Sequence, residues 1–380
     1  MLLLMEIKPE QKVTSRILIF LVPILVLAFL SFTRHRQKTV HSQRPVNAAM
    51  PLVRTYGLGL SVSTFDRPVV SSQEVWQYRD DIRAVFLGEK FGDLEKMAKT
   101  NRDESAFLAG GVLKSSGFYS AIESPASFHP LVDADYESYI EKARRWQAAF
   151  PESAAARISL ARLYLNFANF GRGTGYSNSV SDHQWQVFNE RTAIAQQILV
   201  DAAQLKEHDP AWFDAMLYLA LDAGWSNRDT RELFDCALAV QPTNSFFYRS
   251  YAHYLLPQWY GKIGDIQRLA EEAAAKHPEP VGSTLYFRVM SEVVCYCQTM
   301  KQQLAPADWN KFKLGYANLN DTYGTSNYNA NLYAAMSAMF CDKQAGREAF
   351  KNISFRDTFV WTDDKSFNSI RDWANSPDTQ

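Results

Sequence analysis

The loop Gly171-Arg172-Gly173-Thr174-Gly175 is the segment whose residue types come nearest to a ligand-binding motif. Glycine-rich loops bind phosphate through backbone amides, but a P-loop follows a strand and ends in Lys followed by Ser or Thr. Here the loop follows a predicted helix, and no such lysine is present. The loop is therefore predicted to be a connector between helices. The alternative is a binding loop in which Arg172, Thr174 and Tyr176 contact a partner.

A second unusual segment, residues 255–261 with the sequence LLPQWYG, places two aromatic residues between a proline and a glycine. Pro257 ends a helix, and Gly261 allows the chain to turn. One interpretation is that Trp259 and Tyr260 fold back and fill the space between two helical units. The other is that they form an aromatic platform on which a ligand or peptide stacks.

Acid–base, nucleophilic and metal chemistry find little support in the sequence. The seven histidines are scattered, without His-x-x-x-His or His-Glu-x-x-His spacing. Asp182 and His183 are adjacent and so are poorly placed to form a triad with Ser177. The four cysteines lack the two closely spaced pairs of a zinc site, and buried free thiols are expected. We predict no catalytic residue, no metal site and no cofactor.

The composition is that of a folded protein without affinity for nucleic acid. Hydrophobic residues make up 47% of the chain and charged residues 21%, enough to bury a core without disulfides or metals. The 40 basic and 41 acidic residues give a formal net charge of −1, so no global field attracts a polyanion. A nucleic-acid partner is therefore not expected.

An apolar run near the N-terminus predicts a membrane anchor. Residues 17–33 read ILIFLVPILVLAFLSFT, without a charge, between Arg16 and Arg34. As a helix, the run would be about 25 Å long, at the short end of a bilayer span. A cleaved signal peptide shares this pattern, but the nearest pair of small residues, Ala48-Ala49, lies too far downstream. A buried helix is the remaining alternative.

The residues around this run suggest a domain order but not an orientation. Residues 1–16 form a tail, 17–33 a transmembrane anchor, 34–70 a linker, 71–352 a helical-repeat domain and 353–380 an irregular C-terminal cap. Basic residues flank the span almost evenly, which does not decide its orientation. Large domains behind one N-terminal span most often lie outside the cytoplasm. The expected location is the bacterial inner membrane, single-pass, with the soluble domain on the periplasmic side.

Apolar residues recur with helical spacing from residue 71 onward, and prolines divide the pattern. Pro210, Pro242 and Pro278 follow one another at intervals of 32 and 36 residues. These intervals bracket the roughly 34-residue tetratricopeptide period. Ala237 and Ala273 each stand five residues before the closing proline, where that repeat has a small residue. The expected fold is all-α, a tetratricopeptide-like helical-repeat solenoid with degenerate repeats, behind one N-terminal transmembrane helix.

Four segments in order carry a family resemblance: residues 148–164, the loop 171–176, residues 208–213 and residues 255–261. Together they resemble a bacterial family built on a tetratricopeptide-like domain of unknown function. The resemblance covers roughly residues 75–280. It implies an α-helical repeat fold behind a signal or anchor, and it transfers no catalytic residue.

The leading expectation for function is a membrane-anchored helical-repeat scaffold that binds a protein or peptide partner and performs no catalysis. Repeat arrays present extended concave surfaces suited to this role. The runner-up is an α/α cup-like enzyme or accessory protein that handles a glycan or small molecule. A cup of that kind would need two carboxylates across a cleft. A third reading is a spacer between the membrane and an envelope layer.

Overall fold

The computed structural model describes residues 72–377, apart from residues 105, 128, 174–176 and 296–306. This part of the chain is all-α, as the sequence predicts, and its strands are confined to one short hairpin. The predicted anchor, residues 17–33, lies outside the described residues, as do the tail and the linker. No helix in the described ranges combines the length and apolar character needed to cross a membrane.

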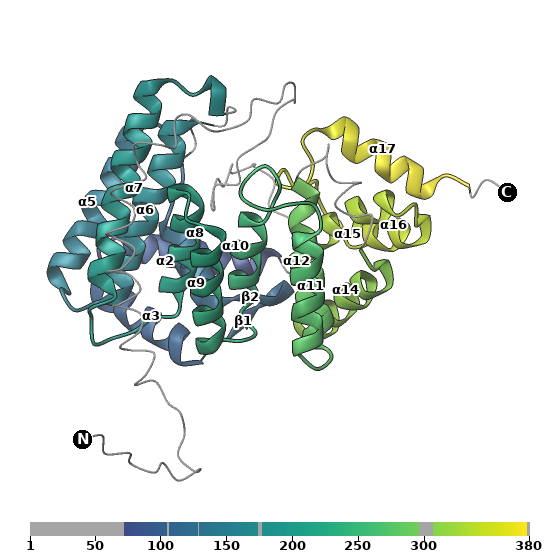
Figure 1. Ribbon diagram of the computed structural model, residues 1–380, viewed down its shortest axis with the longest axis horizontal. Coiled ribbons are helices and arrows are strands. Elements are labelled where there is room, and N and C mark those ends of the chain that lie inside the picture. The colour runs from purple at the N-terminus through teal and green to yellow at the C-terminus, as the bar shows by residue number, and fades with distance from the viewer. Residues whose placement is uncertain (1–71, 105, 128, 174–176, 296–306, 378–380) are drawn as a thin grey trace, which may run out of the picture.

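In the described part of the first half of the chain, helices precede and follow the hairpin in sequence (Figure 1). In chain order the elements are α2 (Ser72–Leu87), α3 (Phe91–Glu104), β1 (Phe107–Leu108), the 3-10 turn η2 (Ala109–Gly111), β2 (Val112–Leu113), α4 (Lys114–Ile122), α5 (Asp133–Ala149), α6 (Ala154–Arg172), η3 (Ser177–Ser179) and α7 (Asp182–Ala202).

The second half is helical throughout its described residues. Its elements are α8 (Ala211–Ala223), α9 (Asn227–Val240), α10 (Ser245–Tyr254), α11 (Asp265–Lys276), α12 (Val281–Met290), the 3-10 turn η4 (Ser291–Cys295), α14 (Trp309–Tyr323), α15 (Asn327–Met339), α16 (Lys343–Phe350) and α17 (Asp364–Asn375).

Local sequence signals account for most helix ends. The residue before a proline is disfavoured in the helical region, and α5 and α9 stop at Phe150-Pro151 and Gln241-Pro242. Serine hydroxyls cap the starts of α6, α7 and α9 by accepting a backbone N–H. The expectation that a helix ends at Pro210 is wrong. Instead α7 ends at Ala202 and Pro210 is the N-cap of α8, because its fixed φ and missing N–H suit the first turn of a helix.

Five helices form what we call the central row: α4, α6, α8, α10 and α12. Each contacts the next member although another helix separates them in sequence. The intervening helices α7 and α9 each pack against both of their neighbours in the row. Most residues of α6 and α8 are buried, whereas α9 buries a single stripe. A helix buried around its circumference lies inside the packing, so the central row forms the interior layer.

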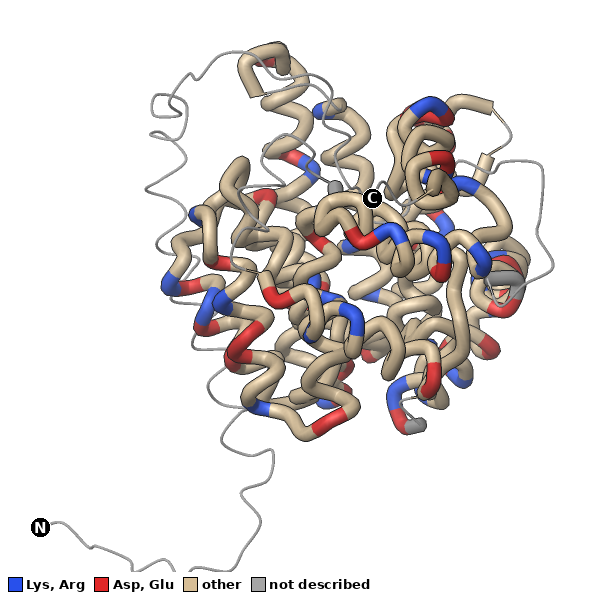
Figure 2. Tube along the Cα trace, turned by 90° about the vertical axis from the view of Figure 1, so that its right-hand side faces the viewer, with Lys and Arg blue, Asp and Glu red and all other residues tan. Residues whose placement is uncertain are grey.

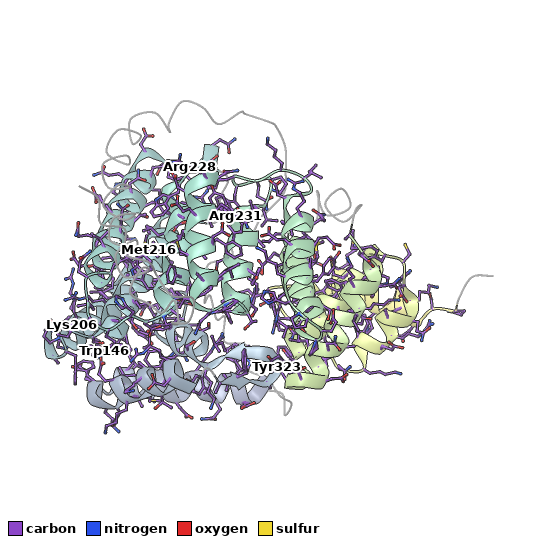
Figure 3. All side chains as sticks on the ribbon, turned by 60° about the horizontal axis from the view of Figure 1, so that its bottom comes forward. Trp146, Lys206, Met216, Arg228, Arg231 and Tyr323 are labelled. Atoms are coloured by element: carbon purple, nitrogen blue, oxygen red, sulfur yellow. The ribbon has the colours of Figure 1, made fainter. Side chains whose placement is uncertain are left out.

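The hairpin joins the two ends of this arrangement. Gly110 of η2 accepts hydrogen bonds through its carbonyl oxygen from Arg288 of α12 and Asn329 of α15. Phe107 packs against Tyr323 of α14, with ring centroids 4.8 Å apart. Figure 3 places Tyr323 where the hairpin meets the C-terminal helices. The described N-terminal and C-terminal parts of the chain are therefore in direct contact.

Gly110 is suited to this contact for two reasons. Its φ of +70° lies in the left-handed region, which side chains with a Cβ rarely adopt. A Cβ at this position would also overlap the Cβ of Ser326, the N-cap residue of α15. The close approach of η2 to α15 therefore depends on glycine.

The C-terminal segment differs from its expectation. Residues 353–380 were expected to be irregular, but α17 occupies Asp364–Asn375 and packs on α15 and α16. Asp363 caps this helix by accepting the backbone N–H of Ser366 at 2.6 Å. Phe367 anchors it by packing against Trp361, with ring centroids 5.6 Å apart. The cap and the aromatic contact explain why this polar segment is helical.

Ala237 and Ala273 are both fully buried, as the repeat pattern predicts. We expect Ala237→Leu and Ala273→Leu each to lower the free energy of unfolding by about 1–3 kcal/mol, because the added methylenes overpack a tight helix contact. Urea denaturation followed by circular dichroism measures the change. Val240→Leu, at an exposed position of α9, is the control and should change stability by less than about 0.5 kcal/mol. If neither Ala237→Leu nor Ala273→Leu changes the free energy of unfolding, close packing at these two positions is contradicted.

Candidate functional site

Four side chains of the central row meet in what we call the Glu123 cluster. Three are charged and one is a hydroxyl: Glu123, Arg162, Asp214 and Ser250. Arg162 of α6 donates through Nε to Glu123 Oε2 at 2.7 Å and through Nη1 to Asp214 Oδ2 of α8 at 2.8 Å. Ser250 of α10 donates to Asp214 Oδ1 at 2.7 Å. Glu123, Arg162 and Asp214 are at most 4% exposed. The cluster ties the end of α4 to α6, α8 and α10.

Burial and pairing act against each other in this cluster. Burial raises the pKa of Glu123, and the guanidinium of Arg162 partly offsets that effect. Burial lowers the pKa of Arg162, but the charges of Glu123 and Asp214 outweigh it and raise the value. Within the described residues, Glu123 Oε1 is buried without a hydrogen-bond partner. Arg162 therefore bridges the two carboxylates.

A second group, the Arg288 cluster, comprises Arg249, His253, Arg288, Glu292, Tyr328 and Asn329. Arg249 of α10 donates through Nε to Glu292 Oε1 at 2.7 Å, and His253 Nδ1 lies 3.7 Å from Glu292 Oε2. Arg288 donates to Asn329 Oδ1 at 3.0 Å. Burial works against ionisation of Glu292, but Arg249 and His253 hold its pKa below the usual range. This cluster joins α10, α12, η4 and α15.

A third group contains a carboxyl group with an unusual pKa. Asn169 of α6 donates to Asp222 Oδ2 at 2.8 Å and to Tyr218 Oη at 3.3 Å, both on α8. Burial raises the pKa of Asp222 to about 7, although Asn169 and Arg172 lower it. All three side chains of this group, Asn169, Tyr218 and Asp222, keep partial contact with solvent. A carboxyl that is protonated near neutral pH can donate a hydrogen bond or a proton.

The predicted loop residues are only partly described. Thr174 and Tyr176 lie outside the described residues. Arg172 ends α6 and is buried, donating to Gly173 O at 3.1 Å, and its guanidinium lies 5.2 Å from the ring centroid of Trp185. These contacts are internal to the junction of α6 and α7. The binding role of Arg172, Thr174 and Tyr176 stays a prediction.

The aromatic pair of the 255–261 segment lies around α10. The ring of Tyr260 stacks on Tyr254 with centroids 4.8 Å apart, and its carbonyl oxygen accepts from Asn227 at 3.0 Å. Trp259 is half-buried against the core, with its ring centroid 6.0 Å from that of His253. Trp259 therefore borders the Arg288 cluster, whereas Arg172 borders the Asp222 group.

We expect Trp259→Ala to lower the free energy of unfolding by about 3 kcal/mol, the low end for loss of a packed aromatic side chain, because the indole is half-buried. Chemical denaturation of wild type and variant measures the difference. Trp76→Ala removes a more exposed tryptophan and serves as control, with a smaller expected loss. If Trp259→Ala unfolds like wild type but loses its partner, the indole is a binding platform rather than a plug.

Sequence reasoning missed the residues of the Glu123 and Arg288 clusters. A usable signal was present, since Arg162, Asp214 and Arg288 each interrupt a run of apolar residues in a helix. A charge inside a buried helix requires a partner, so such an interruption marks an interior polar contact. Among the described residues, no group of three or more His, Cys, Asp or Glu side chains is placed to hold a metal ion.

Comparisons of the chain with protein-family models, with curated proteins and with solved structures found no match. The resemblance of residues 75–280 to a bacterial tetratricopeptide-like family therefore stays a prediction.

Proposed function

We propose that this chain is a membrane-anchored helical-repeat scaffold that binds a protein or peptide partner and performs no catalysis. The observation that carries the proposal is the Glu123 cluster, in which buried, paired charges join the end of α4 to α6 and α8, and the hydroxyl of Ser250 joins α10 to them. Such pairing fixes the relative position of the helices before a partner arrives. A scaffold whose helices are fixed in this way suits recognition, because little order has to be gained on binding.

The proposed array is tetratricopeptide-like, with degenerate repeats. Three features support it: the alternation of central-row and flanking helices, the full burial of Ala237 and Ala273, and the helix ends at Pro242 and Pro278. Because Gly110 accepts hydrogen bonds from Arg288 of α12 and Asn329 of α15, the two ends of the array are in contact.

The anchor and its location are part of the proposal. Residues 17–33 would span the bacterial inner membrane once, leaving the helical domain on the periplasmic side. Deletion of residues 1–45 should release a soluble protein with unchanged helicity, because an anchor contributes nothing to the core. Membrane fractionation and circular dichroism of the full and truncated chains measure this. Aggregation or loss of helical signal in the truncated protein would show that the apolar run belongs to the fold.

The scaffold itself is tested by purification from native membranes with the anchor present. A stoichiometric protein should co-purify with wild type, and Arg249→Gln, which alters the interior row, should lose it. Arg228→Gln is the matched control, because Arg228 lies on α9 with 89% of its side chain exposed. Loss in both variants, or in neither, would contradict binding beside Arg249.

The alternative is a cup that handles a glycan or small molecule, and the Asp222 group favours it. A protonated carboxyl held by Asn169 and bordered by Tyr218 could donate to a sugar hydroxyl or leaving group. A co-purified glycan or metabolite, identified by mass spectrometry and lost in Asp222→Asn, would support this alternative over the scaffold.

A further inference from the structure

Among the described residues, no carboxylate is hydrogen-bonded to the buried guanidinium of Arg288. Its side chain donates to Asn329 Oδ1 at 3.0 Å and to the carbonyl oxygen of Gly110. Both acceptors are neutral. The residue is 5% exposed, and within the described residues its Nε is buried without a hydrogen-bond partner. A guanidinium has five N–H donors, so this one is incompletely satisfied.

The surroundings of Arg288 add positive charge. Burial and then the nearby guanidinium of Arg249 lower the pKa of Arg288 to about 10. Glu292 attracts Arg288, but it already accepts from Arg249 at 2.7 Å and lies near His253. Glu292 is therefore hydrogen-bonded to Arg249 and acts on Arg288 only through its charge. Unbalanced charge in the interior is costly unless a counter-charge is supplied.

Solvent reaches one side of this cluster. The side chain of Arg249 is 25% exposed and that of His253 is 13% exposed. Tyr328 is half-buried, and its hydroxyl accepts from Arg249 Nη2 at 3.4 Å. The ring of Trp259, in the segment that follows α10, lies next to the ring of His253. The partly exposed side chains of Arg249, His253 and Tyr328 thus belong to the same cluster as the buried guanidinium of Arg288.

We propose that Arg249 and Arg288 bind an oxyanion group, a carboxylate or a phosphate, presented by the partner of the scaffold. Guanidinium groups match the geometry of such oxygens and form charge-assisted hydrogen bonds with them. The bound anion supplies the missing counter-charge, and Tyr328 and Trp259 border it. Assigning the anion to a partner rests on the proposed function, but binding of a free anion does not.

The test is the melting temperature of the full chain in detergent, with sodium chloride replaced by sodium phosphate or sodium acetate at constant pH and ionic strength. A ligand that binds the folded state raises the melting temperature. We expect a saturable rise with at least one anion in wild type and in Arg228→Gln. Arg249→Gln should require at least tenfold more anion for the same rise. Arg249 is chosen because Arg288 also holds the hairpin.

Each outcome separates the possibilities. A response to acetate alone identifies a carboxylate, and a response to phosphate alone identifies a phosphate group. No response, or an equal response in Arg249→Gln, overturns the site. If Arg249→Gln does not fold, Arg249→Lys replaces it, since lysine keeps the charge but loses the forked donors. If a partner co-purifies but no anion raises the melting temperature, only the anion site is contradicted. If an anion raises the melting temperature but no partner co-purifies, only the scaffold is contradicted.

Discussion

Arg162→Ala should lower the free energy of unfolding by about 3–5 kcal/mol, the range for breaking a buried ion pair. The substitution leaves Glu123 and Asp214 buried near each other without the guanidinium that binds both. It also releases α6 from α4 and α8. Urea denaturation at pH 7, followed by helical circular dichroism, measures the loss.

Two further variants make the result specific to charge. Arg157→Ala, on the same helix, removes an arginine that donates to the carbonyl oxygens of Pro151 and Asp201, and should cost about 1 kcal/mol. Adding Glu123→Gln and Asp214→Asn to Arg162→Ala should restore part of the stability, because the uncompensated charges are removed. If Arg162→Ala unfolds within about 1 kcal/mol of wild type, the cluster does not organise the central row.

Asp222→Asn should stabilise the protein by about 2–4 kcal/mol at pH 8 and have little effect at pH 4. The folded state holds the proton of Asp222 up to about pH 7, because burial raises its pKa. The unfolded chain releases that proton near pH 4. Between these values the folded state binds the extra proton, so stability falls as the pH rises and is level above pH 7. Asparagine stays neutral throughout and can still accept from Asn169.

The measurement is the free energy of unfolding of wild type and Asp222→Asn at intervals from pH 4 to pH 8. Other buried carboxyls contribute equally to both proteins, so the difference between the two curves isolates Asp222. Asp372→Asn in α17, where the side chain is 73% exposed, is the control and should leave the curve unchanged. Parallel curves for wild type and Asp222→Asn would contradict a carboxyl that stays protonated in the folded state.

The helices were largely predictable because their signals are local. Helical spacing of apolar residues predicted helices from residue 71 onward, and Pro242 and Pro278 follow the ends of α9 and α11. The small residue of the repeat pattern predicted the burial of Ala237 and Ala273. Caps, prolines and periodicity act over a few neighbouring residues, and a single sequence displays them directly.

The interior site was not predictable in the same way. Glu123 and Arg162 are 39 positions apart, and Arg288 and Gly110 are 178 apart. The sequence marks each of them as a charge or glycine in unusual surroundings, but it does not say which one meets which. The glycine-rich loop and the aromatic segment drew attention because their residues are adjacent, yet Arg172 and Tyr260 make internal contacts.

The sequence by itself therefore determined that the described residues are helical, that helices end before Pro242 and Pro278, and which small residues lie inside. The tertiary structure decided that α4, α6, α8, α10 and α12 share one interior row, that the hairpin at Gly110 reaches α12 and α15, and that buried charges meet there. The physical reason is range. Helix formation follows from hydrogen bonds and side chains within a few residues, whereas the pairing of buried charges depends on how whole helices pack.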